Sequence, residues 1–508
     1  RKTYKLQMKI MFVSGGFENL GIEYLSAVLK EHGFQTRLAF DPQLFSDPFL
    51  KIKPLGKFFN YQQWLLKQIE EFNPKIIAFS VVSADYRKAL DLAAKIKSFS
   101  SAHITFGGIH PTSVPDRVII QDCVDSVVIG EGESPLLELA NSIKAGEIDY
   151  TIKNIWFKKD GHIIKNPIRP YIEDLDGLPF PDKELYYQQI PEYRRGYTLI
   201  TRRGCLNSCS YCYNSVMDKI YSKEHKRIRM RSVDNVIEEL KQAKEKYEFK
   251  LLRINDDLFT YNKKWLGNFY NSYKKNINVP LYCFGSPSTI DEEVVAYLKE
   301  LGCYQLCLGV QSIDPKVRRD IFHRYENNEK IISVIALLRK YKIRVVIDNI
   351  IGYPGEKEED LLKIAGFYNQ HRPDRICIFW LIYYPRTAIV NVAREMGVLN
   401  QKDIERLEDT PYETANTLYN VAHTKRKKKY HLFLVLLNLL PQKLYAWILK
   451  HRLYRFLPTI NPALIEYPYT IFARDRLDIP RRRYYLRYFK YMPSILYRKL
   501  KISNNAQK

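Results

Sequence analysis

The sequence lacks the marks of a membrane or secreted protein. Its apolar stretch Leu432–Leu440 ends at a proline, far short of the about 20 residues that a membrane-spanning helix needs. Behind the basic N-terminus only Ile10–Val13 is apolar, which is too short for a signal peptide and typical of a buried strand. The 22 Gly and 25 Pro among 508 residues are too few to indicate disorder, and we find no repeat or low-complexity tract.

Cysteine is also scarce, and its placement excludes a disulfide framework. Only three of the eight cysteines cluster closely in the sequence, namely Cys205, Cys209 and Cys212. Scattered cysteines with one tight group are typical of a reduced, cytoplasmic protein with a single metal site.

Acidic residues are nearly absent from the C-terminal part of the chain. Residues 421–508 contain 20 Lys and Arg against 3 Asp and Glu, and so carry a net charge of +17 of the chain's +24. The remainder is close to neutral, which makes the tail a basic attachment to a larger structure. The length of 508 residues predicts about two to four domains.

The first part of the chain alternates short apolar strands with amphipathic helices. This alternation predicts an α/β fold with a doubly wound parallel sheet. The predicted strands are Lys9–Val13, Ile76–Val82, His103–Phe106 and Ser126–Ile129, and the predicted helices are Leu20–His32, Arg87–Phe99 and Pro135–Ala145. Ligands of such sheets lie outside the carboxyl ends of the strands, where ordinary strand-to-helix turns are the alternative interpretation. The residues at these ends are Gly16, Ser83, Gly107, Gly108, Gly130, Glu131 and Gly132.

A second α/β series follows a connector that contains a predicted hairpin at Ile155–Ile164. About six strand–helix units predict a full or partial (β/α) barrel, with its active site at the carboxyl ends of the strands. The predicted strands are Tyr197–Thr201, Leu251–Ile254, Leu281–Phe284, Gln305–Leu308, Arg344–Ile350 and Arg375–Phe379. We expect an N-terminal α/β domain (1–148), a connector (149–195), the barrel (196–399) and a basic, mainly helical C-terminal region (400–508).

The three clustered cysteines have the spacing C-x3-C-x2-C and follow the first predicted barrel strand. Thiolates are the ligands of iron–sulfur clusters, and three of them leave one iron of a 4Fe–4S cluster open for a small molecule. Zinc is the alternative, but it needs a fourth ligand. His225 lies downstream, and no matching Cys/His pair follows at zinc-finger spacing.

Residues 203–212, which read RGCLNSCSYC, resemble the signature of the radical S-adenosylmethionine (SAM) superfamily. The resemblance implies that the open iron chelates SAM and that reductive cleavage yields a 5′-deoxyadenosyl radical, which abstracts a substrate hydrogen. The SAM contacts that it implies are Tyr211, Asp256, Asp257, Gln311, Ser312, Asp348 and Gly352. An exposed loop aromatic and a helix cap are the alternatives for Tyr211 and for the two adjacent acids. Two positions depart from the family pattern, Pro287-Ser288 and Arg386.

The N-terminal domain resembles the cobalamin-binding domain that precedes many radical SAM barrels. The matching stretches are residues 19–25, 106–111 and 124–133. The resemblance implies cobalamin contacts from Asn19 and Gly21 together with the strand-end residues given above. The motif Asp-x-His-x-x-Gly is missing after the first strand, so cobalt would have no protein His ligand, and His110 is only a weak candidate. A domain that has lost cobalamin stays an alternative.

Together the resemblances imply cobalamin-dependent methylation of a small or lipid-like substrate by an oxygen-sensitive enzyme. The electron donor would be a ferredoxin or a flavodoxin. A cyclisation or oxidation without methyl transfer is one alternative. A non-catalytic iron–sulfur or cobalamin sensor, whose basic tail binds a partner, is another.

The tail has three interpretations. Basic runs at 424–430 and 481–490 lie on either side of the apolar stretch Leu432–Leu440. Such a segment suits the surface of an anionic membrane, which would place the protein at the inner face of the membrane. A helical cap on the barrel is the second interpretation. Arginines alternating with aromatics also suit single-stranded nucleic acid, which we favour least.

Overall fold

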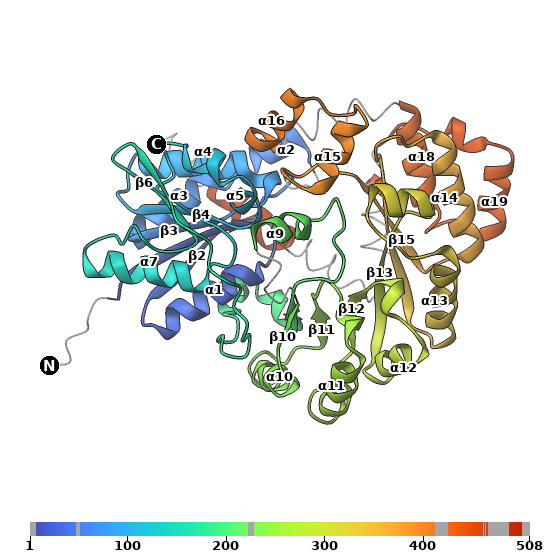
Figure 1. Cartoon of the computed structure of the whole chain (residues 1–508), viewed down its shortest axis with the longest axis horizontal. Coiled ribbons are helices and arrows are strands. Elements are labelled where there is room, and N and C mark those ends of the chain that lie inside the picture. The colour runs from blue at the N-terminus through green and yellow to red at the C-terminus, as the bar shows by residue number, and fades with distance from the viewer. Residues whose placement is uncertain are drawn as a thin grey trace.

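The computed structural model describes residues 7–46, 51–221, 228–411, 425–460, 462, 464–465 and 487–499. Figure 1 shows two α/β units side by side, the first in blue and cyan and the second in green to orange. Helices of the C-terminal region cover the outer side of the second unit. The α/β fold class and the two successive parallel sheets predicted from the sequence are confirmed.

The first sheet has seven strands in the order β2-β1-β3-β4-β5-β6-β7. Strands β1 to β5 pair in parallel, and the predicted hairpin β6–β7 adds two antiparallel strands beside β5. The hairpin turn, Asp160-Gly161, has positive φ at both residues, as a tight hairpin turn requires. The strands are β1 (Lys9–Gly15), β2 (Gln35–Asp41), β3 (Ile76–Ser80), β4 (His103–Gly107), β5 (Ser126–Val128), β6 (Ile155–Lys159) and β7 (His162–Lys165).

Helices connect the strands of this sheet. They are α1 (Leu20–Glu31), α2 (Lys53–Phe58), α3 (Gln62–Phe72), α4 (Tyr86–Lys97), α5 (Ile109–Ser113), α6 (Pro115–Ile119) and α7 (Glu133–Ala145). All of these except α2 and α5 bury apolar side chains in the core of the domain. Strand β2 and helices α2, α3, α5 and α6 are absent from the sequence prediction. The short helix α8 (Glu184–Tyr187) lies in the connector.

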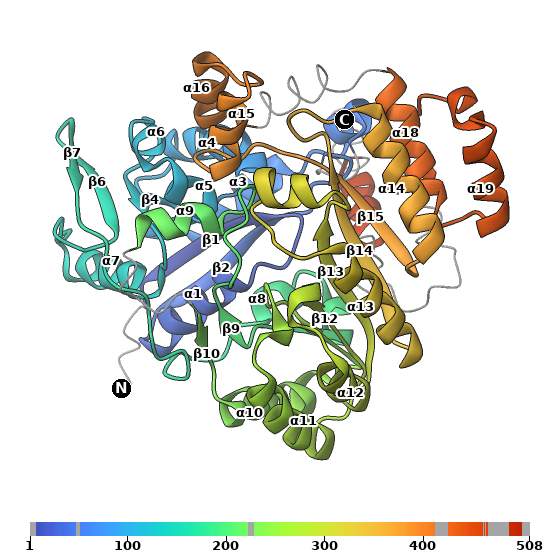
Figure 2. The ribbon, with the colours of Figure 1, turned by 45° about the vertical axis from the view of Figure 1, so that its right-hand side comes forward.

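The second sheet has six parallel strands in the order β15-β14-β13-β12-β11-β8. Since β8 and β15 form its two edges, the barrel is partial. Its strands are β8 (Gly196–Leu199), β11 (Leu251–Ile254), β12 (Leu281–Gly285), β13 (Cys303–Gln311), β14 (Arg344–Ile351) and β15 (Arg375–Trp380). Its outer helices are α10 (Val233–Tyr247), α11 (Lys263–Asn276), α12 (Glu292–Glu300), α13 (Asn328–Lys340) and α14 (Glu358–His371), as Figures 1 and 2 show.

The alternation of side chains along each strand separates a helix-packed face from an inner face. In β13, Leu306, Leu308 and Val310 belong to the core under the helices. The intervening Cys307, Gly309 and Gln311 are only half-buried and face the other way. The inner face is therefore the side on which a substrate and cofactors have access to the strands.

The C-terminal region caps the barrel. It follows α15 (Ala388–Glu395) and contains α16 (Gln401–Asp409), α18 (Lys425–Leu436) and α19 (Gln442–Lys450). Phe433 and Leu434 are 1% exposed within the barrel core, and the ring of Phe433 stacks on Tyr445 at 4.3 Å. The apolar stretch Leu432–Leu440 is thus used inside the protein, as the cap interpretation expects, so a membrane is not needed to bury it. The basic residues 481–486 lie outside the described part of the chain.

The last described segment, residues 487–499, is helical and returns to the first domain. Tyr488, Tyr491 and Ile495 belong to the core of that domain. The buried Arg487 donates a hydrogen bond of 2.8 Å to the carbonyl of Gly16, at the carboxyl end of β1. None of the helices in the described ranges is long and apolar enough to cross a membrane.

Candidate active site

The cysteine loop lies between two short elements, β9 (Arg202–Arg203) and α9 (Asn214–Ile220). Cys205 and Cys209 are buried and Cys212 is half-buried. Burial raises the pKa of the Cys212 thiol to about 12, and the neighbouring charges of Asp257, Cys209 and Cys205 act in the same direction. The three thiols are thus close enough to interact electrostatically.

Backbone hydrogen bonds hold this loop against the barrel. The N–H of Ser210 donates to Phe322 O at 3.2 Å, and Ser210 O accepts from the N–H of Ile389 at 2.8 Å. The loop is therefore held from both sides, by a segment after β13 and by the start of α15.

The donor set of the loop suits an iron–sulfur cluster. Soft thiolates bind iron–sulfur clusters as well as zinc and copper(I), and bound iron would keep the thiolate form in spite of burial. Within the described ranges, no group of three or more His, Cys, Asp or Glu side chains is arranged as a site for a metal ion. The thiolates of a 4Fe–4S cluster bind to different irons, so they lie farther apart than the ligands of a single metal ion.

Arg324 is a residue that the sequence analysis missed. Its guanidinium is 6% exposed and its Nη1 lies 3.7 Å from Cys209 Sγ. Nη2 donates to Gly309 O and to Glu326 Oε1, both at 2.6 Å. This places a fixed positive charge beside the thiolates. The sequence signal for Arg324 is weak. It is one of several arginines in the segment after β13, and no spacing rule connects that segment with the cysteines.

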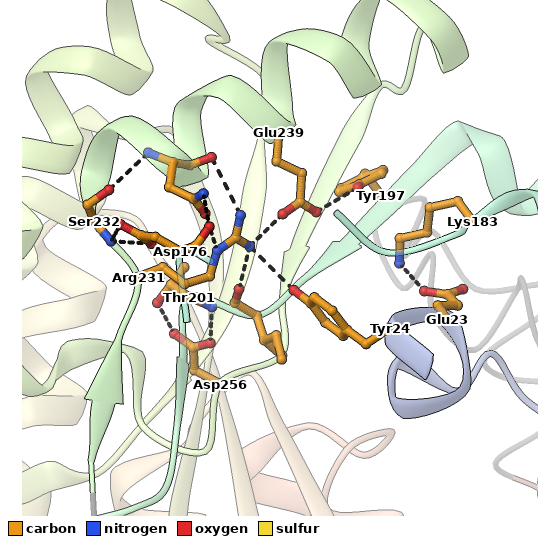
Figure 3. A network of polar contacts seen from close by, with 12 residues as sticks. Glu23, Tyr24, Asp176, Lys183, Tyr197, Thr201, Arg231, Ser232, Glu239 and Asp256 are labelled. Carbon is orange, nitrogen blue, oxygen red and sulfur yellow. Dashed lines mark hydrogen bonds and ion pairs between the residues drawn. The ribbon is translucent and has the colours of Figure 1, made fainter. Parts of the chain in front are cut away.

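The two adjacent acids after β11 have different surroundings. Asp256 is buried and accepts hydrogen bonds from the N–H of Thr201 at 2.7 Å and from its hydroxyl at 2.5 Å (Figure 3). Burial raises its pKa, while the ion pair with Arg202 opposes the rise. Asp257 is exposed, and its Oδ2 accepts from Asn214 at 3.2 Å. Of the two adjacent acids, Asp257 is therefore the one that offers a carboxylate to a ligand beside the cysteines.

The other predicted SAM contacts lie along the carboxyl ends of β13 and β14. Gln311 has φ 67° and ends β13, and the buried Ser312 Oγ accepts from the N–H of Asp314 at 3.1 Å. Gly352 has φ 78°, and a Cβ there would lie 2.6 Å from the Trp380 ring, so only glycine fits. Ser312 shapes a turn, whereas Gln311 and Gly352 border the inner face.

Asp348 and Tyr211 lie deeper on the same side. Asp348 is in β14, and burial raises its pKa to about 7, with Arg375 opposing the rise. The Tyr211 ring packs edge-to-face on Phe322 at 5.2 Å, and Phe322 packs in the same way on Tyr353. The three rings form an apolar wall beside the cysteine loop.

The strand ends of the first sheet form an apolar surface that suits a corrin ring. Phe17, Val82 and Ile109 follow β1, β3 and β4, and they are 39%, 42% and 40% exposed. Gly108 has φ 97°, and a Cβ there would lie 2.8 Å from the Val81 nitrogen, so the close turn needs glycine. Exposed apolar side chains beside a close backbone turn fit a large, flat and mostly apolar cofactor.

The predicted cobalamin contacts Asn19, Gly21 and Ser83 lie along this edge. Asn19 caps α1, because its Oδ1 accepts from the N–H of Ile22, and Gly21 is in the first turn of that helix. Ser83 Oγ lies 3.2 Å from Nδ1 of the buried His110, and burial lowers the pKa of His110 to about 3. Asn19 and Ser83 therefore also have structural partners of their own.

The loop after β5 turns its polar groups toward the barrel. A Cβ at Gly130 would lie 2.0 Å from the Tyr221 hydroxyl, and that hydroxyl accepts from the N–H of Glu131 at 3.2 Å. Burial raises the pKa of Glu131, but Arg203 and Arg229 overcome this and hold it below its usual range. The carboxylate of Glu131 is therefore bound by the other domain, while Gly130 and Gly132 flank it.

A buried polar network also joins the two domains (Figure 3). Arg231 donates to Glu239 at 2.5 Å and to Tyr24 of α1 at 3.5 Å. Lys183 of the connector pairs with Glu23 of α1 at 2.7 Å. Since buried charges need partners, these contacts fix the first domain against the start of the barrel.

Comparison with known proteins agrees with this arrangement. Residues 199–368 match the model of the radical SAM superfamily and residues 13–140 match that of the B12 binding domain. An uncharacterized methyltransferase of Pyrococcus horikoshii is 27% identical over 304 residues, which cover 58% of this chain and 64% of the relative. Cytidylyl-2-hydroxyethylphosphonate methyltransferase of Streptomyces wedmorensis is 23% identical, over 69% of this chain and 72% of that protein.

Among solved structures, OxsB, a cobalamin-dependent SAM radical enzyme with aqua-cobalamin and SAM bound, has a similar fold. The TM-score is 0.63 at 15% identity, and the match covers 99% of this chain and 81% of OxsB. The likeness extends over the C-terminal region as well as the two α/β domains.

The fold and site define a class of enzyme in which a three-cysteine loop on a partial barrel is joined to a cobalamin-type sheet. The chain carries a radical SAM domain at residues 199–368 and a B12 binding domain ahead of it at residues 13–140. The cofactors of these two domains are a 4Fe–4S cluster with SAM, and cobalamin.

Proposed function

We propose that this protein is a cobalamin-dependent methyltransferase that acts on an unreactive carbon of a small or lipid-like substrate. The observation that carries the proposal is the joining of the cysteine loop to the strand-end loop of the cobalamin-type sheet, by Arg203 and Tyr221. The two methyltransferase relatives support the same reaction class.

The cofactors supply the radical and the methyl group, and the residues of this chain bind, orient and shield them. Cys205, Cys209 and Cys212 would hold the cluster, and Asp257 would accept a hydrogen bond from the amino group of SAM. Tyr211 and its aromatic neighbours would shield the reacting groups from water. The apolar strand ends of the first sheet would hold the corrin ring.

We infer that an external one-electron donor such as a ferredoxin or flavodoxin reduces the cluster, because the cleavage of SAM consumes one electron. An oxygen-sensitive cluster would also require the reducing interior of the cell. A lipid-like substrate is favoured less than a small soluble one, because the apolar stretch of the tail is buried in the barrel core.

The test is SAM cleavage by anaerobically reconstituted protein. The triple variant C205A/C209A/C212A should produce no 5′-deoxyadenosine, whereas C123A, which removes a buried thiol of the first domain, should cleave SAM as the parent does. Cleavage by the triple variant would refute the cluster assignment.

Methyl transfer needs a second measurement. A methyltransferase of this kind consumes further SAM as methyl donor, so S-adenosylhomocysteine should accumulate with 5′-deoxyadenosine when substrate and cobalamin are present. Production of 5′-deoxyadenosine alone would indicate cyclisation or oxidation instead. A sensor would form neither product.

A further inference from the structure

A four-residue ion cluster connects the two cofactor-bearing domains. Arg203 pairs with Glu131 at 2.9 Å and with Glu133 at 2.6 Å. Arg229 pairs with the same Glu131 at 2.8 Å and donates to Ile172 O at 2.7 Å. We call these four charged residues, Glu131, Glu133, Arg203 and Arg229, the interdomain clasp.

The clasp is largely shielded from water. The exposed fractions of the side chains are 4% for Arg229, 7% for Glu133, 13% for Glu131 and 17% for Arg203. In such surroundings each charge depends on its partners, and removal of one partner leaves an uncompensated buried charge. A single change of charge in the clasp should therefore alter the position of its other members.

The clasp is attached directly to the cysteine loop. Arg203 and Arg229 face each other in the two-stranded ribbon of β9 and β10 (Arg229–Met230). Arg203 lies two positions before Cys205, while Glu131 and Glu133 follow β5 of the first sheet. Tyr221, just beyond α9, accepts from the N–H of Glu131. One turn of the other domain thus holds the strand before the cysteine loop and the residue that follows helix α9 behind it.

We propose that Glu131 is a positioning residue that couples the cobalamin-type sheet to the iron–sulfur loop, so that an ordered first domain keeps the cluster bound. The inference deepens the proposed function, because it rests on the cluster assignment. By thermodynamic reciprocity, cobalamin bound to the sheet should then protect the cluster from loss, and the cluster should tighten cobalamin binding.

The experiment compares E131Q with E138Q in the full-length, reconstituted protein. Glu138 of α7 forms a bidentate pair with Arg169 of the connector and has no partner in the cysteine loop among the described contacts, so it serves as the control. Iron release to a chelator is followed under anaerobic conditions, with and without hydroxocobalamin. E131Q should release iron several-fold faster than the parent, and hydroxocobalamin should no longer slow the release. E138Q should behave as the parent does.

Equal release by E131Q and the parent would overturn the proposal. So would a variant that fails to bind hydroxocobalamin but retains its cluster, since Glu131 would then be a direct cobalamin contact. If E131Q does not fold, E133Q, which lacks one partner of Arg203, is subject to the same expectations.

A double-variant cycle separates coupling from general weakening. If Glu131 acts through the clasp, the double variant E131Q/R229Q should release iron no faster than the single variant with the higher release rate. Additive effects of the two changes would contradict the proposal. Iron release needs no substrate and no turnover. The protein could therefore fail to cleave SAM while E131Q still releases iron faster than E138Q. This result would refute the proposed function and support the coupling.

Discussion

The adjacent acids Asp256 and Asp257 should respond differently to the same isosteric change. D256N removes the charge that holds Thr201 and Arg202 in a buried site, and should lower the free energy of unfolding by about 2 kcal/mol. D257N changes an exposed side chain and should leave stability within about 0.5 kcal/mol of the parent. Chemical denaturation measures both values.

SAM affinity should show the opposite order. Equilibrium binding of SAM to the reconstituted protein should weaken in D257N, because the accessible carboxylate beside Cys212 is lost. The folded fraction of D256N should bind SAM with an affinity closer to that of the parent than D257N does. A reversed order would assign the SAM contact to Asp256 and leave Asp257 as a surface residue.

Asp348 gives the protein a pH-dependent stability. Its pKa rises from 3.8 to about 7 on folding because of burial. Between these values the folded state keeps a proton that the unfolded state releases, so the contribution of Asp348 to stability is present below about pH 4 and is lost as the pH rises toward 7. D348N should therefore become more stable relative to the parent as the pH rises. Parallel stability curves of the cofactor-free proteins would contradict this.

The sequence places many site residues at strand ends but does not show which groups they contact. Glu131 is predictable as a strand-end residue, yet its partners Arg203 and Arg229 lie 72 and 98 positions away. Asp256 and Asp257 are equivalent in sequence, and only the fold buries one of them. Long-range pairing of this kind depends on how two domains meet, which no local pattern encodes.

Substitutions in α18 and α19 test whether the basic tail packs in the barrel core. F433A removes a ring that is 1% exposed and stacked on Tyr445, and should destabilise the protein by about 3–5 kcal/mol. W447A, on α19, removes a ring that is 52% exposed and should change stability little. Thermal unfolding measures both. Equal effects would mean that α18 does not form part of the barrel core.

Elements with a strong periodic pattern are predictable here, and weakly patterned ones are not. Strand β11 has the predicted bounds and helix α1 begins at the predicted residue, since an apolar run and a regular amphipathic stretch define them. Strand β2 was missed, because Gln35–Asp41 mixes polar and apolar residues at the edge of its sheet. The sequence does not predict that helix 487–499 packs on the first domain, because its own residues give no sign of where in the fold they are buried.

At the scale of the molecule, the helix 487–499 returns to the first domain and packs in its core. Y488A removes a ring that is 8% exposed in this core, and F489A removes a neighbouring ring that is 73% exposed. We expect Y488A to lower the unfolding temperature of the first domain, because a buried ring is lost from its core. Calorimetry measures this, and F489A should keep the profile of the parent. Equal profiles for the two variants would show that the helix does not contribute to the first core.

The return of this helix to Gly16 also has a consequence for biosynthesis. The ribosome makes β1 long before Arg487, yet Arg487 binds the carbonyl of Gly16 at the end of β1, 471 positions earlier in the chain. The amino-terminal domain therefore reaches its final packing only after residues 487–499 have been synthesised. A nascent chain that stalls before this helix is left with an open first domain.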